Sequence, residues 1–308
     1  MPKFHRAVFV VLIALMAASF AAAQTASERV TGRVLYPEGP IWADGRLYVA
    51  EMGASRISAI EGTRRHTFWS ERGCGPTALA PYRDGWLVLC HMRGQAVALD
   101  AAQRVSARIG QDEAGDVFRD PNDVAADGAG GVYFSDPGEF SRDTIPEGAL
   151  VHLDAAGVAR RVAFGLWYPN GVWVDRARRQ LYVSETFRRR VLRYSILEGG
   201  ALGPMEVFAE LDALAPAQTR YEDPFRESGP DGLEIGPDGD LYVAIYGEGR
   251  VLRIAPDGAY RGQIETETRF VTNVTFDPQG RLIAVGMFNI MAPPWPGEVR
   301  RWARLPAP

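Results

Sequence analysis

A short motif recurs six times along the chain, and this repeat limits the fold more than any other feature of the sequence. Each copy begins with proline or threonine, continues with a residue that carries a side-chain oxygen, and is followed by a turn and an apolar run. The copies are Pro37-Glu38-Gly39, Pro76-Thr77-Ala78, Pro121-Asn122-Asp123, Pro169-Asn170-Gly171, Pro230-Asp231-Gly232 and a degenerate Thr272-Asn273-Val274. They return at intervals of roughly 48 residues, close to the ~40–50 residues of a four-stranded propeller blade. The repeat therefore predicts an all-β, six-bladed β-propeller.

The segments between the copies carry strand and turn signals that agree with this fold. Short apolar runs alternate with Asp-Gly turns such as Asp44-Gly45 and Asp238-Gly239, a pattern typical of β-hairpins. We expect residues 24–308 to form one domain with four strands in each blade. The last repeat has room for only three strands, so we expect the segment 29–35 to supply the fourth. That N-terminal strand would close the last blade and leave no sheet edge open.

The first 23 residues have the pattern of a secretory signal peptide. Lys3 and Arg6 precede an apolar run, and Ala21-Ala22-Ala23 provides the small residues of a cleavage site. An uncleaved anchor is the alternative, because the apolar run is only slightly shorter than a membrane span. We expect residues 1–23 to be removed and the mature protein to be exported, periplasmic or secreted, without further membrane attachment.

Export bears on Cys74 and Cys90, the two cysteines of the chain. Disulfides form and persist in oxidising compartments, and the segment between these cysteines reads as a hairpin that could bring them together. One disulfide and two buried free thiols both remain open on this evidence.

The repeat also places polar side chains around one point. Equivalent residues at the start of each inner strand of a propeller ring one end of the central channel, and here they are Glu38, Thr77, Asn122, Asn170, Asp231 and Asn273. Such residues also suit the turn before a strand. Carboxylate and amide oxygens that converge on one axis are, however, the ligands that a hard divalent cation such as calcium prefers. We expect a cation site there, beneath the long irregular segments 137–148, 212–229 and 287–297.

Four of these motifs carry a family resemblance. Pro37-Glu38-Gly39-Pro40, Pro121-Asn122-Asp123-Val124, Tyr168-Pro169-Asn170-Gly171-Val172 and Pro230-Asp231-Gly232-Leu233 together resemble the SMP-30/gluconolactonase/LRE-like family over nearly all of the mature chain. The resemblance implies a six-bladed propeller with one divalent cation, Ca²⁺ first and Zn²⁺, Mn²⁺ or Mg²⁺ as alternatives. It implies Glu38, Asn170 and Asp231 as metal ligands, and Asn122 as a residue that binds substrate or a metal-bound water. Members hydrolyse lactones and some related esters.

The predicted chemistry is the opening of a lactone or related ester by water, with the metal polarising the carbonyl. The resemblance gives Asp231 a dual role as ligand and general base. His91 is a second candidate base, because its ordinary pKa of roughly 6.5 suits proton transfer. We expect His91, Asp136, Trp167 and Tyr168 to lie where they can contact the substrate.

The sequence departs from the family pattern at Asp120. Sugar-lactone hydrolases often carry an arginine at this position, two residues before the asparagine of the third repeat. With Trp167, Tyr168 and Trp295 near the same end, this departure favours an apolar substrate.

A second function remains compatible with the fold. A propeller without catalytic activity could bind a small ligand or a protein on its loop-rich face, since fold does not fix function. The formal net charge of −4 argues against nucleic acid, which requires a basic surface. We therefore expect a small-molecule lactone or ester as partner, and a monomer or weak dimer.

Overall fold

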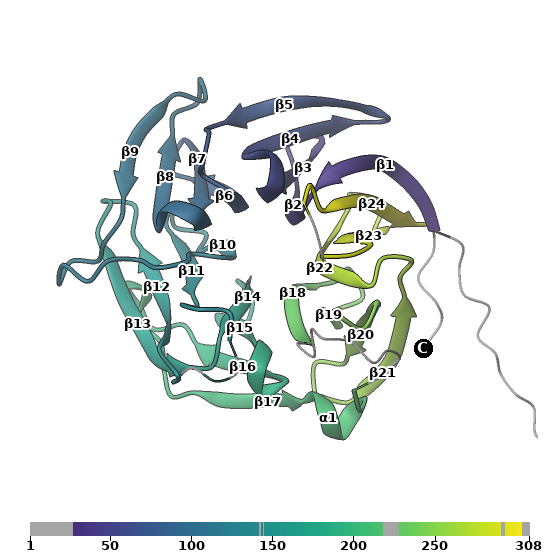
Figure 1. Cartoon of the computed structure of the whole chain (residues 1–308). Coiled ribbons are helices and arrows are strands. Elements are labelled where there is room, and N and C mark those ends of the chain that lie inside the picture. The colour runs from purple at the N-terminus through teal and green to yellow at the C-terminus, as the bar shows by residue number, and fades with distance from the viewer. Residues whose placement is uncertain (1–26, 142, 144, 218–227, 291–292, 304–308) are drawn as a thin grey trace, which may run out of the picture.

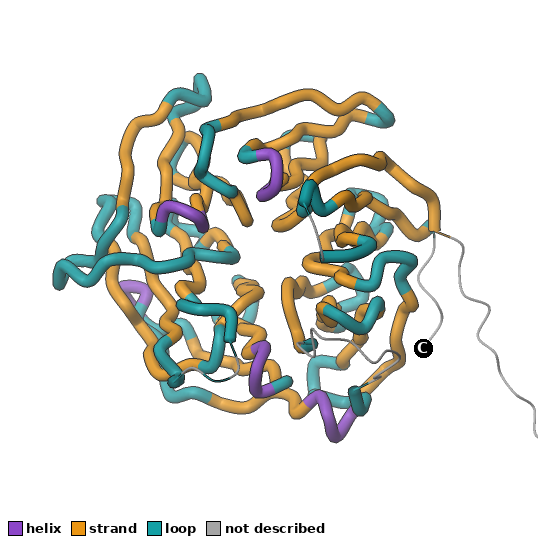
Figure 2. Tube along the Cα trace, viewed as in Figure 1, coloured by secondary structure: helices purple, strands orange, loops and turns teal. Residues whose placement is uncertain are grey.

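Six four-stranded antiparallel sheets surround a central axis, which confirms the predicted six-bladed propeller. Figure 1 shows the blades in chain order around the axis, in a computed structural model that describes residues 27–303 except 142, 144, 218–227 and 291–292. Strands dominate, and the described helices are single turns at strand ends (Figure 2).

Each blade runs from an inner strand at the axis to an outer strand at the circumference. Blade one contains β2 (Pro37–Ala43), β3 (Arg46–Glu51), β4 (Arg56–Glu61) and β5 (Arg64–Ser70). Blade two contains β6 (Pro76–Tyr82), β7 (Gly85–Cys90), β8 (Gln95–Leu99) and β9 (Val105–Ile109). Blade three contains β10 (Val124–Ala126), β11 (Val132–Asp136), β12 (Gly148–Leu153) and β13 (Ala159–Leu166).

The second half of the ring repeats this order. Blade four contains β14 (Pro169–Asp175), β15 (Gln180–Glu185), β16 (Arg190–Ser195) and β17 (Glu206–Glu210). Blade five contains β18 (Gly229–Ile235), β19 (Leu241–Tyr246), β20 (Arg250–Ile254) and β21 (Tyr260–Glu265). Blade six contains β22 (Phe270–Phe276), β23 (Leu282–Met287), β24 (Pro296–Trp302) and β1 (Ser27–Leu35). The short helices are η1 (Met52–Ala54), η2 (His91–Arg93), η3 (Thr186–Arg188), η4 (Glu198–Gly200) and α1 (Leu211–Leu214).

The local sequence explains the hairpins and the strand starts. Asp44 and Gly45 both have positive φ, 50° and 76°, as a tight hairpin turn of the type I′ requires. Pro37, Pro76 and Pro169 each open an inner strand, and proline is tolerated there because the first residue of a strand can lack a ladder donor. These prolines therefore mark where three of the inner strands begin.

The core lies between neighbouring blades, and the second strand of each blade is buried on both faces. Val49, Val183 and Val243 are fully buried in β3, β15 and β19. This explains why the second strands read as continuous apolar runs in the sequence, without the alternation of a half-exposed strand.

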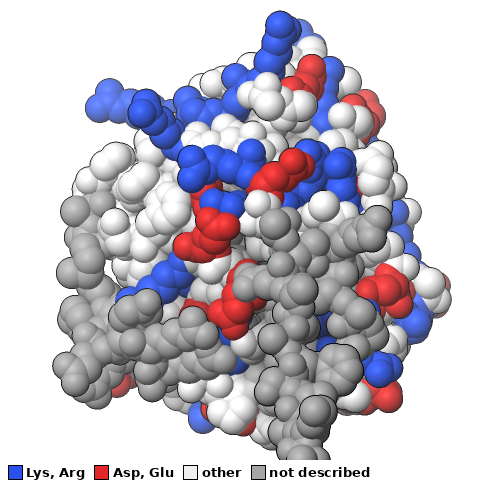
Figure 3. Space-filling view, turned by 90° about the vertical axis from the view of Figure 1, so that its right-hand side faces the viewer, with Lys and Arg blue, Asp and Glu red and all other residues white. Residues whose placement is uncertain are grey.

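The N-terminal strand closes the ring as predicted. β1 pairs antiparallel with β24 from Ser27↔Trp302 to Leu35↔Pro296, so the strand begins two residues before the expected segment. Val34 is fully buried in this seam, and Arg29 Nε lies 2.8 Å from a carboxylate oxygen of Glu298. Figure 3 shows this side of the molecule, where basic and acidic side chains are interspersed.

Cys74 and Cys90 form a disulfide, which decides between the two alternatives that the sequence left open. Both cysteines are fully buried. The bond ties the segment before β6 to the end of β7.

The predicted signal peptide, residues 1–23, lies outside the described residues. Within the described part of the chain, no helix has the length and apolarity needed to cross a membrane.

Candidate functional site

The six residues that the repeat places at the channel are all buried at one end of the inner strands. They are Glu38, Thr77, Asn122, Asn170, Asp231 and Asn273, which we call the channel ring. Asn122 differs from the others because it precedes its strand, β10, and is held by a hydrogen bond from its N–H to the Ser135 carbonyl, 2.9 Å long. The sequence therefore brings six oxygen-bearing side chains to the same end of the inner strands.

A break in strand register accompanies the ring in five of the six blades. The pairing shifts between Glu38 and Ile41 in blade one, and equivalent shifts occur at the starts of β6, β14, β18 and β22. A β-bulge re-aims the side chain that it carries and ends regular pairing. The bulges explain why these side chains do not follow the regular alternation between the two faces of the sheet.

Hydroxyl groups from neighbouring blades fix the backbone of the ring. Thr272 Oγ1 donates to the Pro37 carbonyl at 2.7 Å, and Thr186 Oγ1 donates to the Pro230 carbonyl at 2.8 Å. Ser135 Oγ donates to the carbonyl of Asn170 at 2.6 Å. These hydrogen bonds cross blade boundaries, so the relative positions of the ring residues depend on the closure of the whole propeller.

Two acids of the ring lie in the channel without a basic partner. Among the described residues, neither Glu38 nor Asp231 forms an ion pair with a basic side chain. Burial raises the pKa of Glu38 well above its usual range, and the nearby charge of Asp231 raises it further. Burial and the charge of Asp123 likewise raise the pKa of Asp231. Buried carboxylates that lack a cation are costly, so this arrangement calls for positive charge from a bound ion.

The donor set fits a hard divalent cation. Asn170 donates a hydrogen bond to Asp231, and its Oδ1 atom is buried with no hydrogen-bond partner. An unpaired buried amide oxygen beside two carboxylates matches the all-oxygen ligand sets of calcium. In the described part of the chain, no three His, Cys, Asp or Glu side chains are arranged so that they alone could hold a metal ion. The candidate site is consequently the mixed set Glu38, Asn170 and Asp231 that the resemblance implied.

Three tyrosines surround the two acids, and one of them, Tyr36, was not predicted. Tyr36 and Tyr168 have positive φ, 47° and 57°, although each precedes a proline and neither is glycine. A left-handed conformation is uncommon for such residues and often marks a functional site. The hydroxyls of Tyr36, Tyr168 and Tyr246 all lie within electrostatic range of Glu38 and Asp231. A tyrosine immediately before Pro-Glu and Pro-Asn was the signal in the sequence.

Aromatic rings continue outward from these tyrosines. Phe140 contacts Tyr168, Phe187 and Tyr246, with ring centroids 4.8, 5.1 and 6.0 Å apart. Phe140 is 40% exposed and comes from the segment between β11 and β12. This part of the predicted loop-rich face therefore supplies an apolar wall on the same side as the tyrosines.

The other residues that the sequence places near the substrate have different neighbours in the structure. His91 opens η2, and its Nε2 atom lies 3.9 Å from an Asp120 carboxylate oxygen. Burial lowers the pKa of His91. Trp167 packs under the Arg188 guanidinium, which lies 4.2 Å above its ring, and Trp295 meets the ring of Tyr36 edge-on at 5.7 Å.

Asp136, an expected substrate contact, has its carboxylate engaged by other groups of the protein. Its Oδ1 atom accepts the backbone N–H groups of Arg119 and Asp120, each at 3.0 Å, and its Oδ2 atom lies 3.1 Å from Arg161. The side chain is almost fully buried. Asp136 therefore has its oxygens engaged in holding the segment that carries Asp120 and Asn122.

The same anchor recurs at the ends of other second strands. Glu51 accepts the Leu35 N–H at 3.0 Å, and Glu185 accepts the Trp167 N–H at 2.7 Å. In blade two the equivalent position is Cys90, and its disulfide to Cys74 links the same two segments. Residues two positions before the inner-strand proline are thus fixed in blades one to four, by a carboxylate or by a disulfide.

Comparison with known proteins agrees with this architecture. The pattern of the SMP-30/Gluconolactonase/LRE-like region matches residues 36–283. The chain belongs to this family. The pentonolactonase XacC of Haloferax volcanii is 30% identical over 250 residues, which cover 78% of this chain and 76% of that one.

Solved structures of other propellers share the fold at low sequence identity. A gluconolactonase from Xanthomonas campestris aligns with a TM-score of 0.69 at 21% identity and covers 91% of each chain. A calcium-binding protein, regucalcin, from Agrobacterium tumefaciens aligns with a TM-score of 0.69 at 16% identity, over 92% of this chain and 97% of that one.

Proposed function

We propose that this family member is a divalent-metal-dependent hydrolase that opens lactones or related esters at the channel ring. The observation that carries the proposal is the pair of buried acids, Glu38 and Asp231, beside the unpaired oxygen of Asn170. Relatives named as lactonases, including the pentonolactonase of Haloferax volcanii, support the reaction class. The regucalcin described as calcium-binding supports Ca²⁺ as the first candidate metal, ahead of Zn²⁺, Mn²⁺ and Mg²⁺.

Glu38, Asn170 and Asp231 would hold the metal. A bound divalent cation supplies Lewis-acid polarisation of the ester carbonyl and stabilises negative charge on its oxygen. Without a cation, burial keeps the pKa of both acids raised, and a nearby positive charge lowers such values. The protonation state of the two acids therefore depends on whether the three residues hold a cation.

The hydrolytic step then uses groups of this chain. The Asp231 carboxylate takes a proton from water as the water oxygen bonds to the carbonyl carbon. The bond between that carbon and the ring oxygen of the lactone breaks, and the proton passes to the departing alkoxide, which gives a hydroxy acid. Asn122 lies in the same ring and would orient the water or the substrate through its amide. The tyrosine hydroxyls can donate hydrogen bonds to substrate oxygens on their side.

The walls of the site favour substrates with an apolar part. Phe140, Phe187 and Tyr168 form a continuous aromatic surface. Asp120, which lies beside His91, occupies the position where sugar-lactone hydrolases often carry an arginine. Aromatic surface of this kind selects ligands with hydrophobic groups.

We predict a higher kcat/KM for alkyl and aryl lactones or esters than for gluconolactone. One added methylene in an apolar pocket is worth about 1–3 kcal/mol, so the preference should rise gradually along a chain-length series. Chelation should remove activity toward the whole series, and added Ca²⁺ should restore it. Steady-state kinetics on such a panel test both points. A preference for gluconolactone over every apolar lactone would contradict the substrate assignment alone, whereas turnover after complete metal removal would contradict the mechanism.

Binding of lactones without any turnover, in the presence of each candidate metal, would instead favour the non-catalytic alternative. The same panel of lactones distinguishes this alternative from hydrolysis. A binding module would show saturable ligand binding by calorimetry, and no hydroxy acid would form.

We also propose that residues 1–23 direct export. The disulfide between Cys74 and Cys90 supports this, because structural disulfides are characteristic of oxidising compartments. The exported protein is expected to begin at Gln24 and to contain no free thiol. N-terminal sequencing and thiol titration of the periplasmic or secreted fraction test the prediction. Recovery of the uncleaved chain in the membrane fraction would support the anchor alternative.

A further inference from the structure

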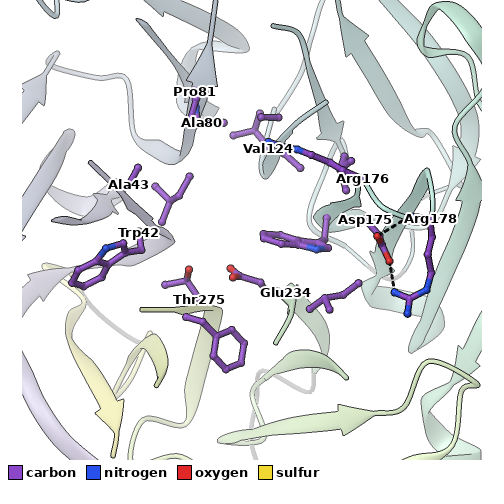
Figure 4. Close-up of a pocket in the computed structure, with 17 residues that line it drawn as sticks. Trp42, Ala43, Ala80, Pro81, Val124, Asp175, Arg176, Arg178, Glu234 and Thr275 are labelled. Atoms are coloured by element: carbon purple, nitrogen blue, oxygen red, sulfur yellow. Dashed lines mark hydrogen bonds and ion pairs between the residues drawn. The ribbon is translucent and has the colours of Figure 1, made fainter. Parts of the chain in front are cut away.

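A cavity of 560 Å³ lies at the end of the channel where the inner strands finish, opposite the channel ring. Figure 4 shows the residues around it, which come from all six inner strands or the turns that follow them. Each inner strand contributes the residue three positions after its ring residue. These six residues are Ile41, Ala80, Ala125, Trp173, Glu234 and Phe276.

A narrow neck separates this cavity from the channel ring. A Cβ atom added at Gly39 would lie 2.4 Å from the Thr77 carbonyl oxygen, and one added at Gly232 would lie 1.9 Å from the Asn273 side chain. The inner strands therefore approach so closely at this level that only glycine fits. A space of 40 Å³ remains between the two ends, too small for an organic molecule.

Asp123 lies at the level of the neck and links blade three to blade four and to blade six. Its Oδ2 atom accepts the Val172 N–H at 3.1 Å and lies 3.4 Å from the Asn273 amide nitrogen. The cavity is therefore a separate chamber, and a ligand in it would not reach Glu38 or Asp231.

The walls of the chamber are mostly apolar. The polar side chains that line it are Glu234, Thr275, Asp175 and the solvent-exposed Arg176 and Arg178. Glu234 is only partly exposed, to the cavity that it lines, and Figure 4 shows its side chain and that of Thr275 pointing toward each other. Burial raises the pKa of Glu234 to about 8, so this carboxyl is largely protonated at neutral pH and can donate a hydrogen bond. At one side, Arg178 is already paired with Asp175 at 2.7 Å.

We propose that this chamber binds a neutral, largely apolar small molecule that carries a ring system and one hydrogen-bond acceptor oxygen. The volume lies within the roughly 300–1,000 Å³ of small-molecule sites. A mostly apolar pocket with a few convergent polar groups is the usual composition of such a site. Trp173 and Phe276 provide ring surfaces for contact with an aromatic or alicyclic body, and Glu234 with Thr275 provides the polar point that orients it.

A charged ligand suits the chamber less well. An anion inside the chamber would meet the Glu234 carboxyl, because the guanidinium groups of Arg176 and Arg178 are solvent-exposed. A cation would find only the Glu234 carboxyl, because Asp175 is already paired with Arg178. Neutral ligands with a carbonyl oxygen avoid both costs, because burial of an unpaired charge is strongly unfavourable.

The test uses 6-propionyl-2-(dimethylamino)naphthalene, a neutral, flat ketone whose emission shifts to the blue in apolar surroundings. We expect saturable binding of one molecule to the full-length mature protein. Ala43→Phe narrows the chamber and Glu234→Leu removes its polar group, and each should weaken binding by about tenfold or more, since an unsatisfied buried carbonyl costs about one order of magnitude. Glu234→Gln keeps a donor and should stay within about threefold of the parent protein.

Matched variants on the other side of the neck serve as controls. Phe140→Ala and Asp231→Ala alter the channel ring and its aromatic wall, and both should bind the probe as the parent protein does. Circular dichroism establishes that each variant is folded. Because two unrelated substitutions alter the chamber, the test remains valid if one of these variants misfolds. Absence of saturable binding, or binding that survives both Ala43→Phe and Glu234→Leu, overturns the proposal. Loss of binding in Phe140→Ala alone would assign the probe to the channel ring and also overturn it.

Discussion

Asp231→Ala is expected to lose both tight divalent-metal binding and measurable lactone hydrolysis. Asp231 is one of the two acids in the channel ring, so its removal takes away about half of the formal negative charge at the site. Calcium affinity depends on ligand charge count, and the same side chain is the proposed acceptor of the water proton. Isothermal calorimetry with Ca²⁺ and steady-state kinetics measure the two losses separately.

Two variants provide the controls for this prediction. Asp231→Asn keeps the size and one oxygen but removes the charge, and it should lose metal affinity while the fold is retained. His91→Ala should reduce kcat by less than tenfold, because His91 lies beside Asp120 and the proton transfer is assigned to Asp231. A general base is typically worth 10²–10⁴-fold, so a loss of that size at His91 with metal still bound would transfer the role of base to His91.

Deletion of residues 29–35 is expected to abolish the soluble native fold. β1 is the outer strand of blade six, and its removal exposes the edge of β24 and the contacts of the buried Val34. Full burial of a valine contributes about 1.5–3 kcal/mol, and an exposed strand edge promotes aggregation. Size-exclusion chromatography and thermal melting of the mature chain with and without this segment measure the effect.

A chain that ends at residue 303 is a matched truncation, because it shortens the other terminus without touching the described strands. It should elute and melt as the parent protein does. A monomeric 29–35 deletion with an unchanged melting temperature would show that closure of the last blade is dispensable.

The repeat predicted the fold because each blade is built from the same order of strands and turns, and these favour the same residue types. Five of the six repeats have a proline at or near the start of the inner strand. A tight turn can follow the inner strand, as Pro37 and Asp44-Gly45 illustrate in blade one. The N-terminal closure followed from counting strands, since an unpaired edge is unfavourable. Both features are visible without any knowledge of side-chain packing.

The environment of the ring was less accessible from the sequence. Asp136 was expected at the substrate, but its oxygens are engaged by two backbone N–H groups and Arg161. That role depends on where the segment before blade three passes, which spacing alone does not determine. The left-handed backbone of Tyr36 and Tyr168 and the close approach at Gly232 likewise depend on how neighbouring blades meet.

Anomalous diffraction tests most directly whether Glu38, Asn170 and Asp231 form a metal site. Crystals of the mature protein soaked in Mn²⁺, which accepts the same oxygen ligands as Ca²⁺, would be measured near the manganese absorption edge. The expected result is one strong peak in the channel within coordination distance of oxygen atoms of all three residues, and its absence in crystals of Asp231→Ala. A peak bound elsewhere, or no peak in crystals of a protein that hydrolyses lactones, would contradict the assignment.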